Sequence, residues 1–408
     1  MNFNRNNNNI TNNNEEEPRN VIEYKNDILY SPPHYEIESV NGYLPSFTVE
    51  QETEYHQFFK TFGFVIIRDV LSKDECQNTI DDIWNYIESC KWYELYDKLK
   101  ESDKTTKRND PKSWGLWPQL HEEGILGYQP VFTETALRNR SNLIIHKVYS
   151  TLLNCDQLYI NHDRYGFFRP TKDVPSPYPR VTPHHHDLNE HLSTTNQTIE
   201  KLDFPKWKTI RNLHLDMNPF QYIESNSDTD RMNRFNSMKY KNSSDFMHEN
   251  NEPGTLKQNE LHIQGLINLV DNQEDDGGFL LVPGFSNHFV DFAKNNSQLK
   301  TMYGTRMTFV VIPDENLVHK QAIRITARAG SLVLWDQKTA HGSTFNNSHR
   351  PRMAQFIKMF KKDLLPKETL QRRSEQIKLK YSKNVNEDVL SKLSQQQRNI
   401  LGLDLYPM

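Results

Sequence analysis

The segment Leu213-His214-Leu215-Asp216-Met217 alternates apolar and polar residues, and this alternation predicts an extended strand over Thr209–Met217. In a strand, the side chains of residues two apart point to the same face. His214 and Asp216 are therefore expected to converge on one face, while Leu215 packs on the other. A helix would separate the two polar side chains, so this expectation depends on the strand assignment.

The β character of the chain is strongest after residue 261, where short apolar runs alternate with turn residues such as Pro283-Gly284. Such a pattern favours an antiparallel sandwich or barrel. Helices are predicted over Val49–Thr61, after a capping box that begins at Ser72, and over residues 134–153. We therefore predict an α+β fold with a mainly β core and flanking helices. The predicted strands after residue 261 are Ile263–Val270, Gly278–Val282, Met307–Ile312, Ile323–Ala327, Ser331–Trp335 and Met353–Phe360.

Composition divides the chain into three parts. Residues 1–45 form an Asn-rich N-terminal tail, which is expected to be disordered because it offers little apolar surface to bury. Residues 46–363 are expected to form the main domain, with a polar insertion at 218–258. Residues 364–408 are rich in Lys, Gln and Leu and are expected to form a C-terminal helical extension.

Charge and composition narrow the classes of partner. The 49 basic and 53 acidic residues give a net charge of −4 without a basic block, which argues against a nucleic-acid partner. No apolar run is long enough for a membrane span, and no signal peptide is visible, so a cytoplasmic location is expected. Cys76, Cys90 and Cys155 lack the spacing of a disulfide framework or a zinc site. A small-molecule substrate is the expected partner, while the oligomeric state is not readable from the sequence.

His214, Asp216 and the distant His341, in Ala340-His341-Gly342-Ser343, form a candidate metal-binding set. Two imidazoles and one carboxylate occupy one face of a metal ion and leave the other face open, as in non-haem Fe(II) oxygenases. A single His-x-Asp pair is a weak motif, but its strand context favours this one. The run His184-His185-His186-Asp187 is a second-choice site, because it lacks strand character and a loop positions ligands poorly.

Arg352 follows His341 by eleven residues and stands at the start of an apolar strand. Its planar guanidinium can bind a carboxylate through two parallel hydrogen bonds. Ser343 shares a strand face with His341 and could bond the same carboxylate. Arg350 is the alternative to Arg352, since a spacing of two residues keeps both on one face. Further candidates for the pocket, each also explained as a core or strand residue, are Trp207, Phe220, Trp335, Gln264 and Asn212.

Four elements in order resemble the phytanoyl-CoA dioxygenase family of Fe(II)/2-oxoglutarate-dependent oxygenases. They are His214-Leu215-Asp216, the glycine-containing turn of residues 277–286, His341-Gly342-Ser343, and Arg352. The stretch of residues 63–71 is also similar to the N-terminal strand and helix of the family. The chain departs from the pattern in its long insertion and in a turn that reads Pro-Gly-Phe-Ser-Asn-His instead of Pro-Gly-Ser-His.

The resemblance implies a double-stranded β-helix, the cupin-like jelly roll. It implies that His214, Asp216 and His341 are the catalytic iron ligands and that Arg352, with Ser343, binds the distal carboxylate of 2-oxoglutarate. The implied reaction is hydroxylation of a small molecule, with lipids and acyl-CoA thioesters among the candidates, and release of succinate and CO2. Ascorbate is a candidate reductant. The alternatives are a cupin-like metal-dependent hydrolase or isomerase, which would not need Arg352, and an inactive jelly-roll interaction module.

Overall fold

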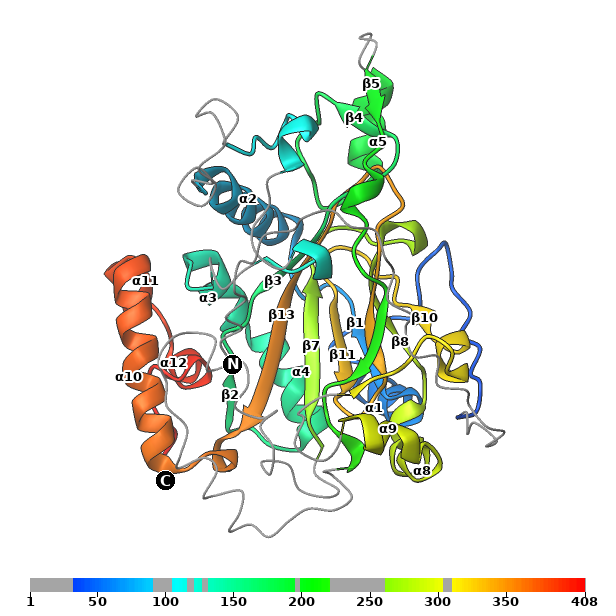
Figure 1. Ribbon diagram of the computed structural model, residues 1–408. Coiled ribbons are helices and arrows are strands. Elements are labelled where there is room, and N and C mark those ends of the chain that lie inside the picture. The colour runs from blue at the N-terminus through cyan, green and yellow to red at the C-terminus, as the bar shows by residue number, and fades with distance from the viewer. Residues whose placement is uncertain are drawn as a thin grey trace, which may run out of the picture.

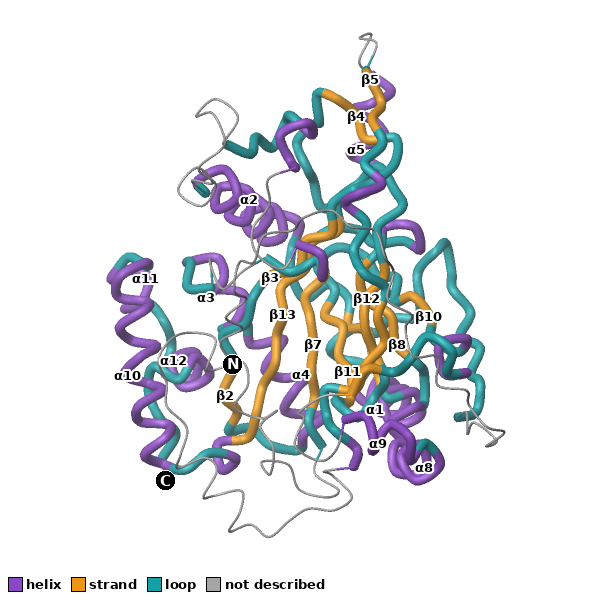
Figure 2. Tube along the Cα trace, in the orientation of Figure 1, coloured by secondary structure: helices purple, strands orange, loops and turns teal. Residues whose placement is uncertain are grey.

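The computed structural model describes residues 32–90, 105–115, 121–126, 131–194, 199–220, 261–303 and 310–407. Two antiparallel sheets dominate this part of the chain (Figures 1 and 2). The larger has six strands in the order β1-β11-β7-β13-β2, with β3 also paired to β13. Its strands are β1 (Phe64–Ile67), β2 (Leu158–Ile160), β3 (Tyr165–Phe168), β7 (Ile263–Asn268), β11 (Leu332–Asp336) and β13 (Arg352–Lys361).

The second sheet has five strands in the order β10-β8-β12-β6-β9. Its strand β6 is the predicted strand of the His-x-Asp pair, and its strand β12 begins at His341. A separate two-stranded sheet pairs β4 (Val174–Ser176) with β5 (Glu200–Leu202). The strands of the five-stranded sheet are β6 (Asn212–Leu215), β8 (Gly278–Leu281), β9 (Val310–Val311), β10 (Ile323–Arg324) and β12 (His341–Thr344).

The two sheets pack face to face, as the alternation of side chains along their strands shows. On β13, Met353 and Ile357 point into a large helix-facing core, whereas Ala354 points into the core between the sheets. Phe279 and Leu281 of the five-stranded sheet meet Ala354 in that inner core. This arrangement agrees with the predicted mainly β core. It also means that even-numbered positions of β13 face the interior where the candidate site lies.

Helices cover the outer faces of both sheets. The outer face of the six-stranded sheet packs against the N-terminal helices α1 to α4 and against the C-terminal helices. The C-terminal helices lie beside the β2 edge (Figure 1). The helices of this layer are α1 (Glu52–Phe62), α2 (Lys73–Ser89), α3 (Glu134–Arg140), α4 (Leu143–Leu153), α10 (Lys367–Asn384), α11 (Glu387–Ser391) and α12 (Gln395–Leu401). The five-stranded sheet packs against α8 (Phe289–Asn295) and α9 (Ser297–Tyr303), and α5 (His185–Thr194) lies near β4 and β5.

Local sequence signals explain how these helices begin. The capping box predicted at Ser72 is confirmed, since the Ser72 hydroxyl accepts from the amide of Glu75 and the Glu75 carboxylate accepts from the amide of Ser72. The single helix predicted over 134–153 is wrong. Asn142 interrupts it, because its side chain accepts hydrogen bonds from the amides of Ile144 and Ile145 and so starts a second helix.

Parts of the predicted domain boundaries differ from the structure. The sequence predicts a disordered N-terminal tail to residue 45, yet residues 32–45 are described and contact the core. Leu44 is buried and bonds Thr326 through its amide, and Tyr35 packs edge-on against Phe62. The apolar residues near the end of the tail provide the surface that its Asn-rich start lacks. Residues 1–31 lie outside the described part of the chain.

The C-terminal segment is helical, as predicted, but Ile377 and Leu401 are buried in the same core as α1 to α4. Residues 221–260 lie outside the described residues, so the predicted insertion at 218–258 falls there except for its first three positions. None of the described helices is long and apolar enough to span a membrane.

Candidate metal centre

Strand register brings the two distant histidines together. β12 pairs with β6 so that His341 lies directly opposite His214, and their ring centroids are 4.6 Å apart. Asp216 follows at the end of β6, with Oδ1 3.4 Å from His214 Nε2 and Oδ2 3.5 Å from His341 Nε2. One donor atom from each residue lies within 4.8 Å of the others. The structure thus places the three predicted ligand residues around one metal-sized space.

Each imidazole is oriented by a hydrogen bond at Nδ1, which leaves Nε2 directed at the shared space. His341 Nδ1 lies 2.9 Å from the carbonyl oxygen of Thr339, so this nitrogen donates a hydrogen bond to that oxygen and Nε2 points to the shared space. His214 Nδ1 lies 3.0 Å from Asn212 Oδ1, and the Asn212 amide donates to Ser343 Oγ. Such outer hydrogen bonds fix the tautomer of metal-binding histidines.

Asp216 is held by the facing sheet. Gln264 Nε2 on β7 donates to Asp216 Oδ2 at 2.6 Å, and Trp335 Nε1 on β11 donates to Gln264 Oε1 at 2.9 Å. Burial raises the pKa of Asp216, but hydrogen bonds and charge interactions with His214 and His341 outweigh this, so the pKa lies well below its usual value. The carboxylate therefore stays ionised, as a metal ligand must. About a quarter of its side chain is exposed, so the centre is open on one side.

Arg352 lies in the interior beside two glycines. Its side chain is 2% exposed, and a Cβ on Gly278 would lie 2.7 Å from its Nε. A Cβ on Gly166 would lie 3.3 Å from Arg352 Nη1. The guanidinium also lies over the ring of Phe168. Nε has no hydrogen-bond partner among the described residues. Burial, with a smaller contribution from Arg324, lowers the pKa of Arg352 to about 9. Because burying a cation is costly unless it is paired, a buried guanidinium with an unpaired Nε is a suitable partner for an anionic ligand.

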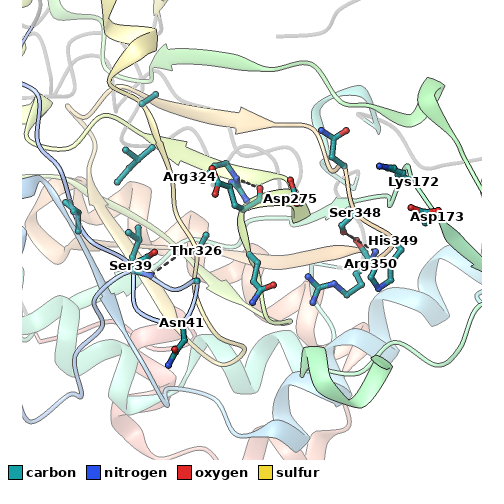
Figure 3. A pocket seen from close by; sticks show the side chains of 18 residues that line it. Ser39, Asn41, Lys172, Asp173, Asp275, Arg324, Thr326, Ser348, His349 and Arg350 are labelled. Carbon is teal, nitrogen blue, oxygen red and sulfur yellow. Dashed lines mark hydrogen bonds between the residues drawn. The ribbon is translucent and has the colours of Figure 1, made fainter. Parts of the chain in front are cut away.

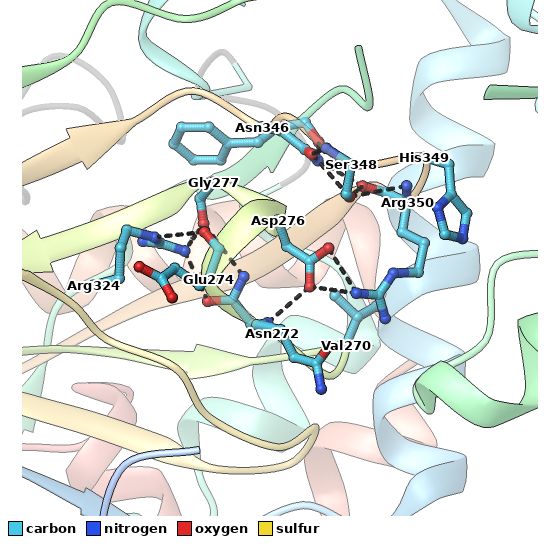
Figure 4. Close-up of polar contacts among 12 residues, drawn as sticks. Val270, Asn272, Glu274, Asp276, Gly277, Arg324, Asn346, Ser348, His349 and Arg350 are labelled. Carbon is cyan, nitrogen blue, oxygen red and sulfur yellow. Dashed lines mark hydrogen bonds and ion pairs between the residues drawn. The ribbon is translucent and has the colours of Figure 1, made fainter. Parts of the chain in front are cut away.

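Arg350 has a different partner. Its Nη2 donates to both carboxylate oxygens of Asp276, at 2.8 and 2.9 Å, and Asp276 is almost fully buried (Figure 4). This ion pair holds the loop of residues 346–350 against the loop of residues 272–277. The guanidinium of Arg350 is therefore already engaged by an acidic partner. Ser343 accepts from Asn212, so its predicted contact with a carboxylate ligand stays a prediction.

A polar cavity of about 940 Å³ is lined by Arg350 and by Asp275, Arg324 and Ser348 among others (Figure 3). Its walls carry charges of both signs and do not include the His214, Asp216 and His341 set. The guanidinium of Arg324 forms part of this wall and donates to the carbonyl group of Gly277 (Figure 4). It also donates to the carbonyl group of Phe279.

The second-choice histidine run lies away from the metal centre, at the start of α5. The rings of His184 and His186 stack at 5.5 Å, and His186 Nε2 lies 2.9 Å from Asp187 Oδ1. His184 faces Asp271 at 3.6 Å. Among the described side chains, the group of three with metal-binding geometry is His214, Asp216 and His341.

The other candidates from the sequence divide into two groups. Asn212, Gln264 and Trp335 lie at the centre, where they hold His214 and Asp216 through hydrogen bonds. Phe220 is buried in the core outside the five-stranded sheet, and Trp207 stacks on the ring of Phe204. Sequence reasoning missed the roles of Thr339 and Gly278, although Gly278 lies in the glycine-containing turn of residues 277–286.

Comparison with solved structures gives matches of low sequence identity. A solved structure of the GlcNAc Inducible Gene 2 protein (DUF1479) from Candida albicans aligns with a TM-score of 0.48 and 12% identity, over 90% of this chain and 78% of the other. EctD from S. alaskensis, solved with 2-oxoglutarate and 5-hydroxyectoine, aligns with a TM-score of 0.40 and 15% identity, over 83% of this chain and 88% of the other.

Two sequence matches are more specific. A curated Dictyostelium discoideum protein, named "Putative phytanoyl-CoA dioxygenase", is 33% identical over 356 residues, which covers 86% of each chain. The sequence model of the phytanoyl-CoA dioxygenase family (PhyH) matches residues 59–354. The resemblance inferred from the sequence is thereby confirmed, and it supports a dioxygenase-type oxidoreductase. The chain belongs to the phytanoyl-CoA dioxygenase family.

Proposed function

We propose that this protein is a non-haem Fe(II)- and 2-oxoglutarate-dependent dioxygenase that hydroxylates a small organic molecule and releases succinate and CO2. The observation that carries this proposal is the combination of an open two-histidine, one-carboxylate centre with a buried Arg352 on the facing sheet. Membership of the family supports the same reaction class. The two facing sheets are proposed to form the double-stranded β-helix of these enzymes.

His214, Asp216 and His341 are the proposed catalytic iron ligands. Their donor set is typical of Fe(II) sites that keep one face open for co-substrates. When bound there, Fe(II) with 2-oxoglutarate supplies the activation of O2. The chain itself directs both Nε2 atoms inward, because Thr339 and Asn212 accept hydrogen bonds at the two Nδ1 atoms. Gln264 holds the carboxylate in place from the opposite sheet.

Arg352 is proposed to bind the distal carboxylate of 2-oxoglutarate, with Ser343 as an additional donor. A carboxylate at this position would compensate a charge that the protein buries without an acidic partner among the described residues. Gly166 and Gly278 leave the space in which the guanidinium lies. A cupin-like hydrolase would have no use for this buried arginine, and an inactive interaction module would not need the tautomer-fixing hydrogen bonds. Ascorbate as reductant and a cytoplasmic location stay predictions from the sequence.

The proposal is tested by anaerobic titration of the metal-free protein with Fe(II) and then 2-oxoglutarate. Iron and a bidentate 2-oxo acid are expected to give a weak visible charge-transfer band that saturates at one equivalent of each. Zn(II) in place of Fe(II) is the blank. Tight zinc binding without any iron-dependent band would instead support the hydrolase alternative, and no metal binding would support the inactive module.

Gly278→Ala is expected to weaken 2-oxoglutarate binding and to lower the free energy of unfolding by about 1–3 kcal/mol. Gly278 has a φ of +88°, and the added methyl group would displace the Arg352 guanidinium. The measurement is the charge-transfer titration combined with denaturant unfolding.

Gly402→Ala is the matched control for this variant. Gly402 has a φ of +76° and also faces an arginine, Arg373, but it lies at the end of α12, outside the site. This variant should lose stability and keep its affinity for 2-oxoglutarate. Equal 2-oxoglutarate affinities in both glycine variants would count against a ligand-binding role for the Gly278 position.

A further inference from the structure

Three side chains form a hydrogen-bonded chain that joins the six-stranded sheet to the candidate metal centre. Trp335 on β11 and Gln264 on β7 lie opposite each other in the strand register. Trp335 Nε1 donates to Gln264 Oε1 at 2.9 Å, and Gln264 Nε2 donates to Asp216 Oδ2 at 2.6 Å. Since Trp335 is 4% exposed, its N–H group must find its hydrogen-bond partner within the protein.

The two ends of this chain determine how the amide of Gln264 is oriented. An indole nitrogen can only donate a hydrogen bond, and an ionised carboxylate such as that of Asp216 can only accept one. Gln264 must therefore turn Oε1 to Trp335 and Nε2 to Asp216. A flipped amide would place two donors together at one end and two acceptors together at the other. Trp335 thus fixes a hydrogen-bond donor in front of a proposed metal ligand.

Trp335 also packs against a second member of the proposed ligand set. The ring centroids of Trp335 and His341 are 5.3 Å apart, and the ring centroid of Phe279 lies 4.2 Å from that of Trp335. Phe279 and Trp335 belong to the core between the two sheets, so the indole is held firmly in place. Trp335 therefore supports His341 by ring packing and Asp216 through the amide of Gln264.

The hydrogen bond from Gln264 makes the two carboxylate oxygens of Asp216 unequal. Oδ2 accepts this bond and lies 3.5 Å from His341 Nε2, whereas Oδ1 lies 3.4 Å from His214 Nε2. An oxygen that already accepts a strong hydrogen bond is a poorer second ligand for a cation. A carboxylate that bound through both oxygens would occupy one of the three positions that two imidazoles and one oxygen leave open on an octahedral metal ion.

We propose that Gln264, oriented by Trp335, is a positioning residue that restricts Asp216 to one metal-binding oxygen, Oδ1. The inference rests on the proposed function, and it explains how the chain keeps positions on the metal ion free for co-substrates. Without the Gln264 amide, the carboxylate would be free to rotate and to bind through both oxygens. 2-Oxoglutarate would then have to displace one of them, so its affinity would fall while the metal ion stays bound.

The test combines the infrared difference spectrum between Mn(II)-loaded and metal-free protein with the anaerobic titration by Fe(II) and 2-oxoglutarate. The antisymmetric and symmetric stretching bands of a carboxylate lie further apart when one oxygen binds a metal ion than when both do. Labelling of aspartate with 13C assigns the bands. The variants are Gln264→Leu, which removes the donor to Asp216, and Trp335→Phe, which removes the indole N–H group and keeps an aromatic ring beside His341.

Gln355→Leu is the matched control. Gln355 is also a buried glutamine of the six-stranded sheet, but its Oε1 accepts a hydrogen bond from Asn139 of α3 at 2.7 Å, on the face that the helices cover. This variant should lose stability, because Asn139 loses a buried acceptor, and should keep the wild-type infrared bands and 2-oxoglutarate affinity. Equal losses of 2-oxoglutarate affinity in both glutamine variants would indicate a purely structural effect and overturn the assignment.

In Gln264→Leu, the two aspartate bands should move closer together. The 2-oxoglutarate affinity of its Fe(II)-loaded form should fall at least about tenfold, with one equivalent of metal still bound. Trp335→Phe should change both readouts in the same direction and by less, and it provides the test if Gln264→Leu does not fold. Unchanged or more widely separated bands in these variants would overturn the proposal, as would wild-type bands typical of binding through both oxygens. Failure of wild type to bind metal or to form the charge-transfer band would refute the proposed function instead.

Discussion

Asp216→Ala should reduce 2-oxoglutarate turnover by at least about a thousandfold, which corresponds to about 4 kcal/mol in transition-state stabilisation. The carboxylate is the one anionic member of the proposed ligand set, and it lies 3.4 and 3.5 Å from the two histidine Nε2 atoms. Without it, two imidazoles remain, and the Fe(II) affinity should fall with the activity. The measurements are succinate formation and metal content after equilibration with Fe(II).

The fold should survive this substitution, because Asp216 follows the last residue of β6 and is partly exposed. Its removal also leaves the two strand-paired histidines and the Gln264–Trp335 hydrogen bond in place. Asp291→Ala, an exposed acidic position on α8, is the control and should keep full activity. Succinate production at the wild-type rate in Asp216→Ala would contradict the assignment of this residue as an iron ligand.

Arg352→Met should weaken 2-oxoglutarate binding by at least about a hundredfold, a typical cost of removing one partner from a buried charge pair. Fe(II) binding should stay intact, since Arg352 belongs to β13 and the metal ligands belong to the other sheet. The charge-transfer titration measures both quantities. In the absence of 2-oxoglutarate, the variant should be at least as stable as wild type, because it no longer buries a cation.

Arg350→Met is the matched control and should show the opposite pattern. Its removal leaves Asp276 buried without its cation, at a cost of about 3–5 kcal/mol in unfolding free energy, and 2-oxoglutarate binding should be nearly unchanged. The contrast between the two arginine variants separates ligand binding from structural support. Weakened 2-oxoglutarate binding in Arg350→Met alone, with normal binding in Arg352→Met, would reverse the roles of the two arginines.

Much of this centre could be predicted from local sequence. The apolar and polar alternation around His214 and Asp216 predicts a strand, and β6 places both side chains on one face as that period requires. The capping box at Ser72 depends on residues three positions apart and was also predictable. Local prediction fails where a nearby side chain competes for backbone hydrogen bonds, as at Asn142.

By itself, the sequence determined the family, the candidate donor set and the strand that carries two of its members, because these depend on residue order and on the two-residue period of a strand. Only the tertiary structure separates the surroundings of Arg350 from those of Arg352, which share that period, and it thereby favours Arg352 in the proposed role. Asp276 binds the guanidinium of Arg350, whereas Gly166 and Gly278 border that of Arg352. These three residues belong to segments far from the two arginines in the chain. The pairing of His214 with His341 likewise depends on strand register, which long-range packing sets.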